Sequence, residues 1–134
     1  MGRIEKLTLY SLVLLLVWGN MVSGLGAGLA CPDWPLCFGS FFPEINFPIF
    51  MEHGHRVLGL FVTIFFAFLA RKRLKLYKGA YKLIPIICSI LLAVQIIAGA
   101  LVVILQLETN ITTFHFGNAI IIFILIYIMC TYTD

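Results

Sequence analysis

Residues 83–107 read LIPIICSILLAVQIIAGALVVILQL, a stretch without a single charged side chain. An α-helix rises about 1.5 Å per residue, so a helix of this length crosses the roughly 30 Å hydrocarbon core of a bilayer. The rest of the 134-residue chain has a similar character, because 62% of its residues are hydrophobic and only 11% are charged. In a soluble domain about a quarter of the residues are charged. The composition therefore predicts a membrane protein and excludes a soluble domain.

Three further apolar stretches, 7–28, 51–70 and 114–131, have lengths close to the same span. Regular alternation of apolar and polar residues is absent from them, and each is about twice as long as a strand of a membrane β-barrel. The sequence therefore predicts an all-α membrane protein. We expect a single domain over 1–134, folded as a bundle of four transmembrane helices at 7–28, 51–70, 83–107 and 114–131.

The basic residues set the orientation of these helices, since Lys and Arg concentrate in cytoplasmic loops. Arg3 and Lys6 precede the first helix, and a cluster separates the second from the third: Arg71, Lys72, Arg73, Lys75, Lys78 and Lys82. Both termini are therefore predicted to be cytoplasmic, in a multi-pass protein of the cell (plasma) membrane. The loops 29–50 and 108–113 then face outward. Topology accounts for the net charge of +3, so we expect no nucleic-acid partner.

The N-terminal segment has a second interpretation as a secretory signal, with residues 28–31 (GLAC) as a lipoprotein-type cleavage box. Its apolar run is longer than the roughly 7–15 residues of a signal core. Cleavage would also place the two termini on opposite sides of the membrane. We therefore predict that 7–28 is retained as the first helix.

The second apolar stretch opens with ionisable residues, which are costly inside a membrane and often functional there. Glu52, His55 and Arg56 are spaced i, i+3 and i+4 and therefore share one face of a helix. One interpretation is structural, with a Glu52–Arg56 ion pair and His55 packed beside it. The other is a functional site on this face. His53 lies about 100° away around the helix, and we expect it at the membrane interface.

His115 lies at the start of the fourth stretch, which runs in the same direction as the second. His55 and His115 are therefore expected at similar depth near the outer surface, facing each other within the bundle. Two imidazoles in this arrangement favour axial ligation of a heme iron. Zinc is disfavoured because it needs three or four ligands and the cysteines lie elsewhere. A heme at this position would allow Arg56 to pair with a propionate.

The four cysteines fall in two compartments. Cys31 and Cys37 flank residues 32–36 (PDWPL) in the outward loop, where disulfides persist. They are either a structural staple of the loop or a redox-active pair beside the heme. Cys88 and Cys130 lie toward the cytoplasmic ends of their helices, and we predict that they are buried packing residues.

Three motifs together resemble the heme A synthase family. Residues 24–37 (GLGAGLACPDWPLC) are similar to the glycine-rich end of the family's first helix and the cysteine loop that follows it. Residues 52–56 (EHGHR) match its Glu-x-x-His-Arg motif, and residues 113–118 (TFHFGN) resemble the start of its fourth helix. The resemblance covers nearly the whole chain.

This resemblance implies roles for five residues. Glu52 is the implied catalytic carboxylate, His55 and His115 are the implied heme ligands, and Cys31 and Cys37 form the implied disulfide. The implied activity is that of an oxidoreductase, which converts the C8 methyl of heme O to the formyl of heme A by successive hydroxylations. Heme b is the implied cofactor. Heme O synthase and an electron donor are the further partners that the resemblance implies.

The chain departs from the usual members of the family, which have eight helices in two four-helix halves, because it matches only the N-terminal half. It also has Ser23 and Leu25 where the family often has Arg and Thr. One half supplies one histidine pair, so we expect a homo-oligomer. Gly24 and Gly28 are either a close-contact surface on the first helix or the turn into the cysteine loop.

The alternative function is that of a non-catalytic b-type heme-binding membrane protein, either an electron carrier or a heme carrier. It explains His55 and His115 equally well but gives no role to Glu52 or to the cysteine pair. A purely structural helical subunit, the third interpretation, explains none of these residues.

Overall fold

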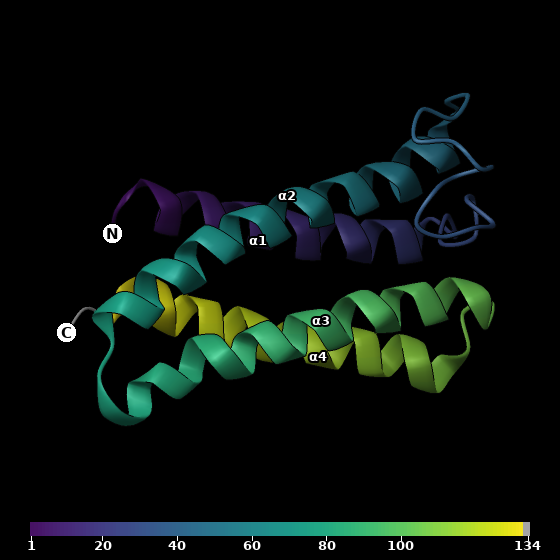
Figure 1. The fold of residues 1–134 in the computed structure, drawn as a ribbon. Helices are drawn as coiled ribbons and strands as arrows, with labels where there is room; N and C mark the ends of the chain where they lie inside the picture. The colour runs from purple at the N-terminus through teal and green to yellow at the C-terminus, as the bar shows by residue number, and fades with distance from the viewer. Residues whose placement is uncertain (133–134) are drawn as a thin grey trace.

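The computed structural model describes residues 1–132, and this part of the chain is helical (Figure 1). Its elements are α1 (Arg3–Gly24), α2 (Phe47–Leu76), the short 3-10 helix η1 (Gly79–Lys82), α3 (Leu83–Ile104) and α4 (Thr109–Thr131). α1 packs on α2 and α3 packs on α4, so the molecule is two helical hairpins lying side by side. The all-α architecture with four long helices is as the sequence predicts.

The first helix ends at Gly24, short of the predicted boundary, because the chain forms a glycine cap there. Gly26 adopts a left-handed φ of 64°, and the N–H of Ala27 donates to the carbonyl of Val22 at 2.9 Å. This is the Schellman pattern, in which glycine avoids the cost of a left-handed backbone. Gly28 therefore lies beyond the helix. Of the two interpretations of Gly24 and Gly28, the turn into the cysteine loop is confirmed, and the contact surface on one helix is wrong.

α2 is longer than the apolar stretch 51–70, at 30 residues. Its start is fixed by Asn46, whose side chain accepts a hydrogen bond from the N–H of Ile49 at 2.9 Å, and by Pro48 in the first turn. Its other end continues to Leu76 through basic residues, which favour the C-terminus of a helix. Apolar length alone therefore underestimated this helix.

The turn between the last two helices also differs from the predicted limits. α3 ends at Ile104, and Gln106 and Leu107 adopt positive φ values in the turn that follows. α4 begins about a turn before the predicted residue, because the side chain of Glu108 accepts a hydrogen bond from the N–H of Ile111 at 2.9 Å. Capping thus extends α4 beyond its apolar stretch.

Exposed apolar side chains cover the outside of the bundle. Large ones occur on every helix, for example Val13, Phe68, Ile90 and Ile121. Such a surface is typical of contact with lipid. Within residues 1–132, three segments are long and apolar enough to cross a membrane by length and composition: Arg3–Gly24, Gly79–Ile104 and Thr109–Thr131.

The two ends of the bundle differ in composition. Both chain termini and the basic connection between α2 and α3 lie at one end, and the cysteine loop lies at the other (Figure 1).

The main hydrophobic core includes the predicted packing residues Cys88 and Cys130, which are free and buried. Its other buried members are Leu9, Leu12, Val62, Phe66, Leu69, Ala70, Tyr77, Ile122, Ile126 and Met129.

An ionic cluster around the buried carboxylate of Glu5 ties three helices together at the end of the bundle where α1 begins. The carboxylate of Glu5 in α1 accepts hydrogen bonds from Lys72 Nζ at 2.6 Å and from Arg73 Nη2 at 3.1 Å, both on α2. The thiol of Cys130 on α4 donates to the backbone carbonyl of Glu5 at 3.5 Å. A carboxylate that is only 2% exposed requires such cationic partners, so the cluster fixes how α1 sits against α2 and α4.

Candidate functional site

The loop between α1 and α2 is closed by a disulfide between Cys31 and Cys37, both fully buried. Within the loop, the carboxylate of Asp33 accepts hydrogen bonds from the N–H groups of Phe38, at 2.6 Å, and Gly39, at 2.7 Å. These two bonds lower the pKa of Asp33 below its ordinary value of 3.8, the bond from Gly39 having the largest effect. The ionised carboxylate therefore stabilises the turn that carries Cys37.

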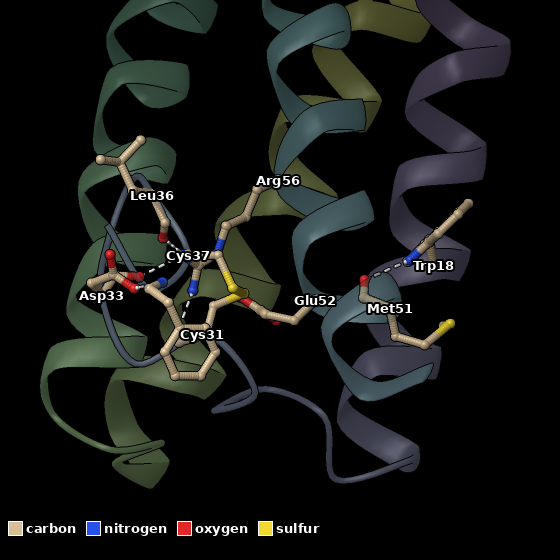
Figure 2. A network of polar contacts seen from close by, with 9 residues as sticks. Trp18, Cys31, Asp33, Leu36, Cys37, Met51, Glu52 and Arg56 are labelled. Carbon is tan, nitrogen blue, oxygen red and sulfur yellow. Dashed lines mark hydrogen bonds and ion pairs between the residues drawn. A yellow bond between two sulfur atoms is a disulfide. The ribbon is translucent and has the colours of Figure 1, made fainter. Parts of the chain in front are cut away.

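Arg56 anchors this loop to α2 (Figure 2). Its Nη1 donates to the carbonyls of Asp33, at 2.5 Å, and Leu36, at 2.7 Å, and its Nη2 donates to the carbonyl of Cys31 at 3.1 Å. Its Nε donates to Glu52 Oε1 at 2.8 Å. These four donations use nearly all of the N–H groups of the guanidinium. Arg56 was expected to pair with a heme propionate, whereas its partners in the structure are the loop and Glu52.

Glu52 is buried and forms the ion pair with Arg56 that the structural interpretation predicts. The pair lies on the side of α2 that faces the cysteine loop (Figure 2). On another side of α2, Trp18 of α1 donates from Nε1 to the carbonyl of Met51 at 2.8 Å. Gly54 lies against the same indole, since a Cβ there would approach it to 2.8 Å. The first turns of α2 are therefore fixed by both α1 and the loop.

The two candidate heme ligands each lie against a glycine of the neighbouring helix. A Cβ on Gly19 of α1 would be 2.8 Å from Cε1 of His55, and a Cβ on Gly99 of α3 would be 3.2 Å from Cε1 of His115. In each hairpin, therefore, a histidine on the second helix packs against a glycine on the first helix.

Both imidazoles contain a buried nitrogen with unused hydrogen-bonding capacity. The Nδ1 atoms of His55 and His115 have no hydrogen-bond partner within residues 1–132. Buried polar atoms are nearly always paired, so an unpaired one needs an explanation, of which an absent ligand is one. Both histidines that the sequence proposes as ligands therefore have a buried ring nitrogen that is free to take a further partner.

A polar relay fixes the orientation of His115. Asn118 donates from Nδ2 to the carbonyl of Leu91 at 3.0 Å and to Oε1 of Gln95 at 2.8 Å. This places Nε2 of Gln95 toward Nε2 of His115, 3.4 Å away. An amide nitrogen only donates, so Nε2 of His115 is the acceptor and has the lone pair. Nε2 is a ring nitrogen through which histidine binds iron.

Several of these contacts were not predicted from the sequence. Gln95 was visible as a polar residue in an apolar stretch, which is a signal for a buried partner. Gly19 and Gly99 have no distinguishing signal, because a glycine within a transmembrane helix is common. The role of Arg56 as the anchor of the loop depends on backbone carbonyls, which the sequence does not distinguish.

The fold and these two regions define a helical multi-pass membrane protein, with a histidine on the second helix of each hairpin and a disulfide-closed loop anchored by Arg56. Comparison with known proteins gives its relationship. The chain is 31% identical over 124 residues to the heme A synthase of Bacillus pumilus, covering 90% of this chain and 40% of that protein. It is 32% identical over 117 residues to the heme A synthase of Staphylococcus saprophyticus, covering 83% and 38%. No family model and no solved structure matches it.

This chain is therefore a relative of the heme A synthases and a multi-pass protein of the cell membrane, as its motifs and hydropathy predict. Similarity to the heme A synthase of Geobacillus kaustophilus, 30% over 115 residues, supports the same assignment and covers 84% of this chain and 36% of the relative. The chain spans about 40% of the length of the curated relatives it matches.

The carboxylate of Asp33 generates a prediction about pH. Its pKa is lower in the folded loop than in an unfolded chain, so its stabilising effect is present above its ordinary pKa and is lost as pH falls through the folded pKa. We expect a water-soluble phosphine to reduce the Cys31–Cys37 disulfide slowly at about pH 7 and about pH 5, and faster at about pH 3.

The Asp33→Asn variant should be reduced fast at all three pH values. Glu44→Gln serves as the matched control, since Glu44 is an exposed carboxylate in the same loop, and it should behave like the parent. A rate for Asp33→Asn equal to that of the parent at neutral pH would show that the carboxylate does not stabilise the turn.

Proposed function

We propose that this chain is a heme A synthase-like membrane oxidoreductase, which oxidises the C8 methyl of heme O to the formyl of heme A and binds heme through two histidines near the outer membrane face. The observation that carries this proposal is the pair His55 and His115, each packed on a glycine and each with an unpaired buried nitrogen. The relationship to proteins named heme A synthase supports it independently.

We propose a topology of four transmembrane helices with both termini cytoplasmic. The basic connection 77–82 and the two termini lie at the same end of the bundle, as the distribution of Lys and Arg requires (Figure 1). α2 is the helix with ionisable residues near both ends. Its Glu52, Arg56 and Arg73 all have charged or hydrogen-bonding partners, which reduces the cost of placing them at the edges of a membrane.

The residues present fit a heme. His55 on α2 and His115 on α4 would hold the heme iron through their imidazoles. Nε2 of His115, which has the lone pair, would exchange its hydrogen bond from Gln95 for the iron. The two hairpins contact each other less extensively than the helices within each hairpin do, and binding of a flat ring between them would require the hairpins to separate. When bound, heme b would supply a redox-active iron.

Glu52 is the residue that we propose as the catalytic carboxylate. It is buried, one helical turn from His55, and its Oε1 is held by Arg56. A carboxylate fixed in this way accepts or passes on protons at a defined position. Arg56 then has a positioning role, since it orients Glu52 and holds the cysteine loop at once. Heme O synthase and an electron donor are the partners that this activity requires.

A second candidate function is favoured by the Glu52–Arg56 ion pair itself. A carboxylate occupied by a structural ion pair has less freedom to take part in proton transfer. In this alternative the chain is a non-catalytic b-type heme-binding protein, an electron carrier or heme carrier, in which Glu52 only supports Arg56 and the loop.

Production of heme A distinguishes the two functions. We expect that expression of the chain in cells that make heme O but lack heme A yields heme A, measured by chromatography of extracted hemes. Glu52→Gln should abolish heme A and leave bound heme in place, because it removes the proton acceptor without touching the histidines. Glu44→Gln should retain the activity. A parent chain that binds heme and yields no heme A would establish the non-catalytic function.

Heme ligation generates a separate prediction. His55→Ala and His115→Ala should each remove or alter the low-spin visible bands of the purified protein, because each variant deletes one axial ligand. His53→Ala is the matched control on the same turn of α2, and its visible bands should equal those of the parent. If both ligand variants kept the parent spectrum, the assignment of the histidine pair would be wrong.

We also propose that the active form is a homo-oligomer, because one chain supplies one histidine pair and the relatives it matches are more than twice as long. The mass of the active protein in a nanodisc, measured by light scattering, should exceed that of one 15.1 kDa chain. A monomer that converts heme O to heme A would contradict this expectation.

A further inference from the structure

We propose that Cys31, Cys37 and His53 form a binding site for a thiophilic metal ion, Cu(I), when the disulfide is reduced. The ligand atoms of these three side chains lie within 4.8 Å of one another. Both cysteines are fully buried, and His53 projects from the first turns of α2 beneath the loop. The proposal concerns the cysteine loop and does not depend on the heme chemistry proposed above.

The hydrogen bonding of His53 leaves one ring nitrogen available for a metal. Its Nε2 lies 2.9 Å from the carbonyl oxygen of Phe41. A carbonyl can only accept, so Nε2 has the proton and the neutral ring has its lone pair on Nδ1. That Nδ1 is buried and has no hydrogen-bond partner in the described part of the chain. Metal-binding histidines commonly show this arrangement, in which the other ring N–H donates to a backbone carbonyl.

The loop has a set of contacts that do not depend on the sulfur–sulfur bond. Arg56 donates to the carbonyls of Cys31 and Leu36, and Asp33 accepts from two backbone N–H groups. Cys37 and Ser40 exchange two backbone hydrogen bonds of 3.1 Å each. These contacts remain when the disulfide opens. Reduction therefore leaves the two sulfurs adjacent to each other and to His53.

The chemistry of the reduced loop selects a soft ion. A dithiol reductant at the outer face transfers two electrons and two protons to the cysteine sulfurs, and its own sulfurs become a disulfide. Binding of Cu(I) then displaces the two thiol protons and forms two Cu–S bonds and one Cu–N bond, without any change in the oxidation state of copper. Thiolate ligands favour Cu(I) over harder ions. The disulfide thus determines whether the site is available.

Anaerobic titration tests the proposal. The purified protein is reduced with a water-soluble phosphine, which becomes its oxide by taking oxygen from water, and the excess phosphine is removed. Cu(I) is then added in competition with the chelator bathocuproine disulfonate. We expect the reduced protein to bind one more equivalent of Cu(I) than the oxidised protein. The oxidised protein is the matched control, since it retains Cys88, Cys130, His55 and His115.

Two further measurements identify the ligands. The double variant Cys31→Ser/Cys37→Ser should no longer bind the additional equivalent of Cu(I). The variant His53→Ala should bind that Cu(I) about tenfold or more weakly, an effect similar to the loss of a group that supports a metal site. Copper K-edge absorption of the unaltered reduced protein should show two sulfur neighbours and one nitrogen. Equal binding by the reduced and oxidised proteins, or a copper without sulfur neighbours, would overturn the proposal, and neither result bears on heme binding.

Discussion

Polar groups enclosed by apolar helices need partners, and this constraint determines most of the architecture. The chain has few charged residues, and those that are buried are paired: Glu5 with Lys72 and Arg73, and Glu52 with Arg56. The first group fixes the end of the bundle that carries the termini, and the second fixes the end that carries the cysteine loop. Between them the packing is largely apolar. Within the described residues, five buried side-chain atoms have no hydrogen-bond partner. Two of them, Glu5 Oε2 and Arg73 Nε, belong to the first ionic group, and the other three are the Nδ1 atoms of His53, His55 and His115.

These three histidines separate into two sites with different chemistry. His55 and His115 come from different hairpins, each packed against a glycine, and we propose that together they hold a heme. His53 lies beside the two cysteine sulfurs, with its tautomer set by a backbone carbonyl. Arg56 connects the two regions, since one guanidinium holds both the carboxylate next to His55 and the backbone of the cysteine loop.

The sequence predicted the helices and the pairing of the site residues better than it predicted their contacts. Apolar length identified four segments, because the cost of leaving backbone groups unpaired in a bilayer leaves few alternatives to a helix. It missed the true ends of α2, which depend on the cap at Asn46 and on basic residues beyond the membrane. Spacing placed Glu52 beside Arg56. The loop anchor depends on contacts with backbone carbonyls, and the supporting glycines depend on aromatic rings of a neighbouring helix. No local pattern encodes either kind of tertiary contact.

The central claim is that one heme iron is held by His55 and His115 together. Pulsed electron paramagnetic resonance of the oxidised, heme-loaded protein, made with nitrogen-15 histidine, tests it most directly. The account predicts a low-spin iron with strong hyperfine coupling to two imidazole nitrogens, and the loss of one coupling in either alanine variant. A high-spin iron, or a low-spin iron coupled to a single imidazole in the parent protein, would contradict it.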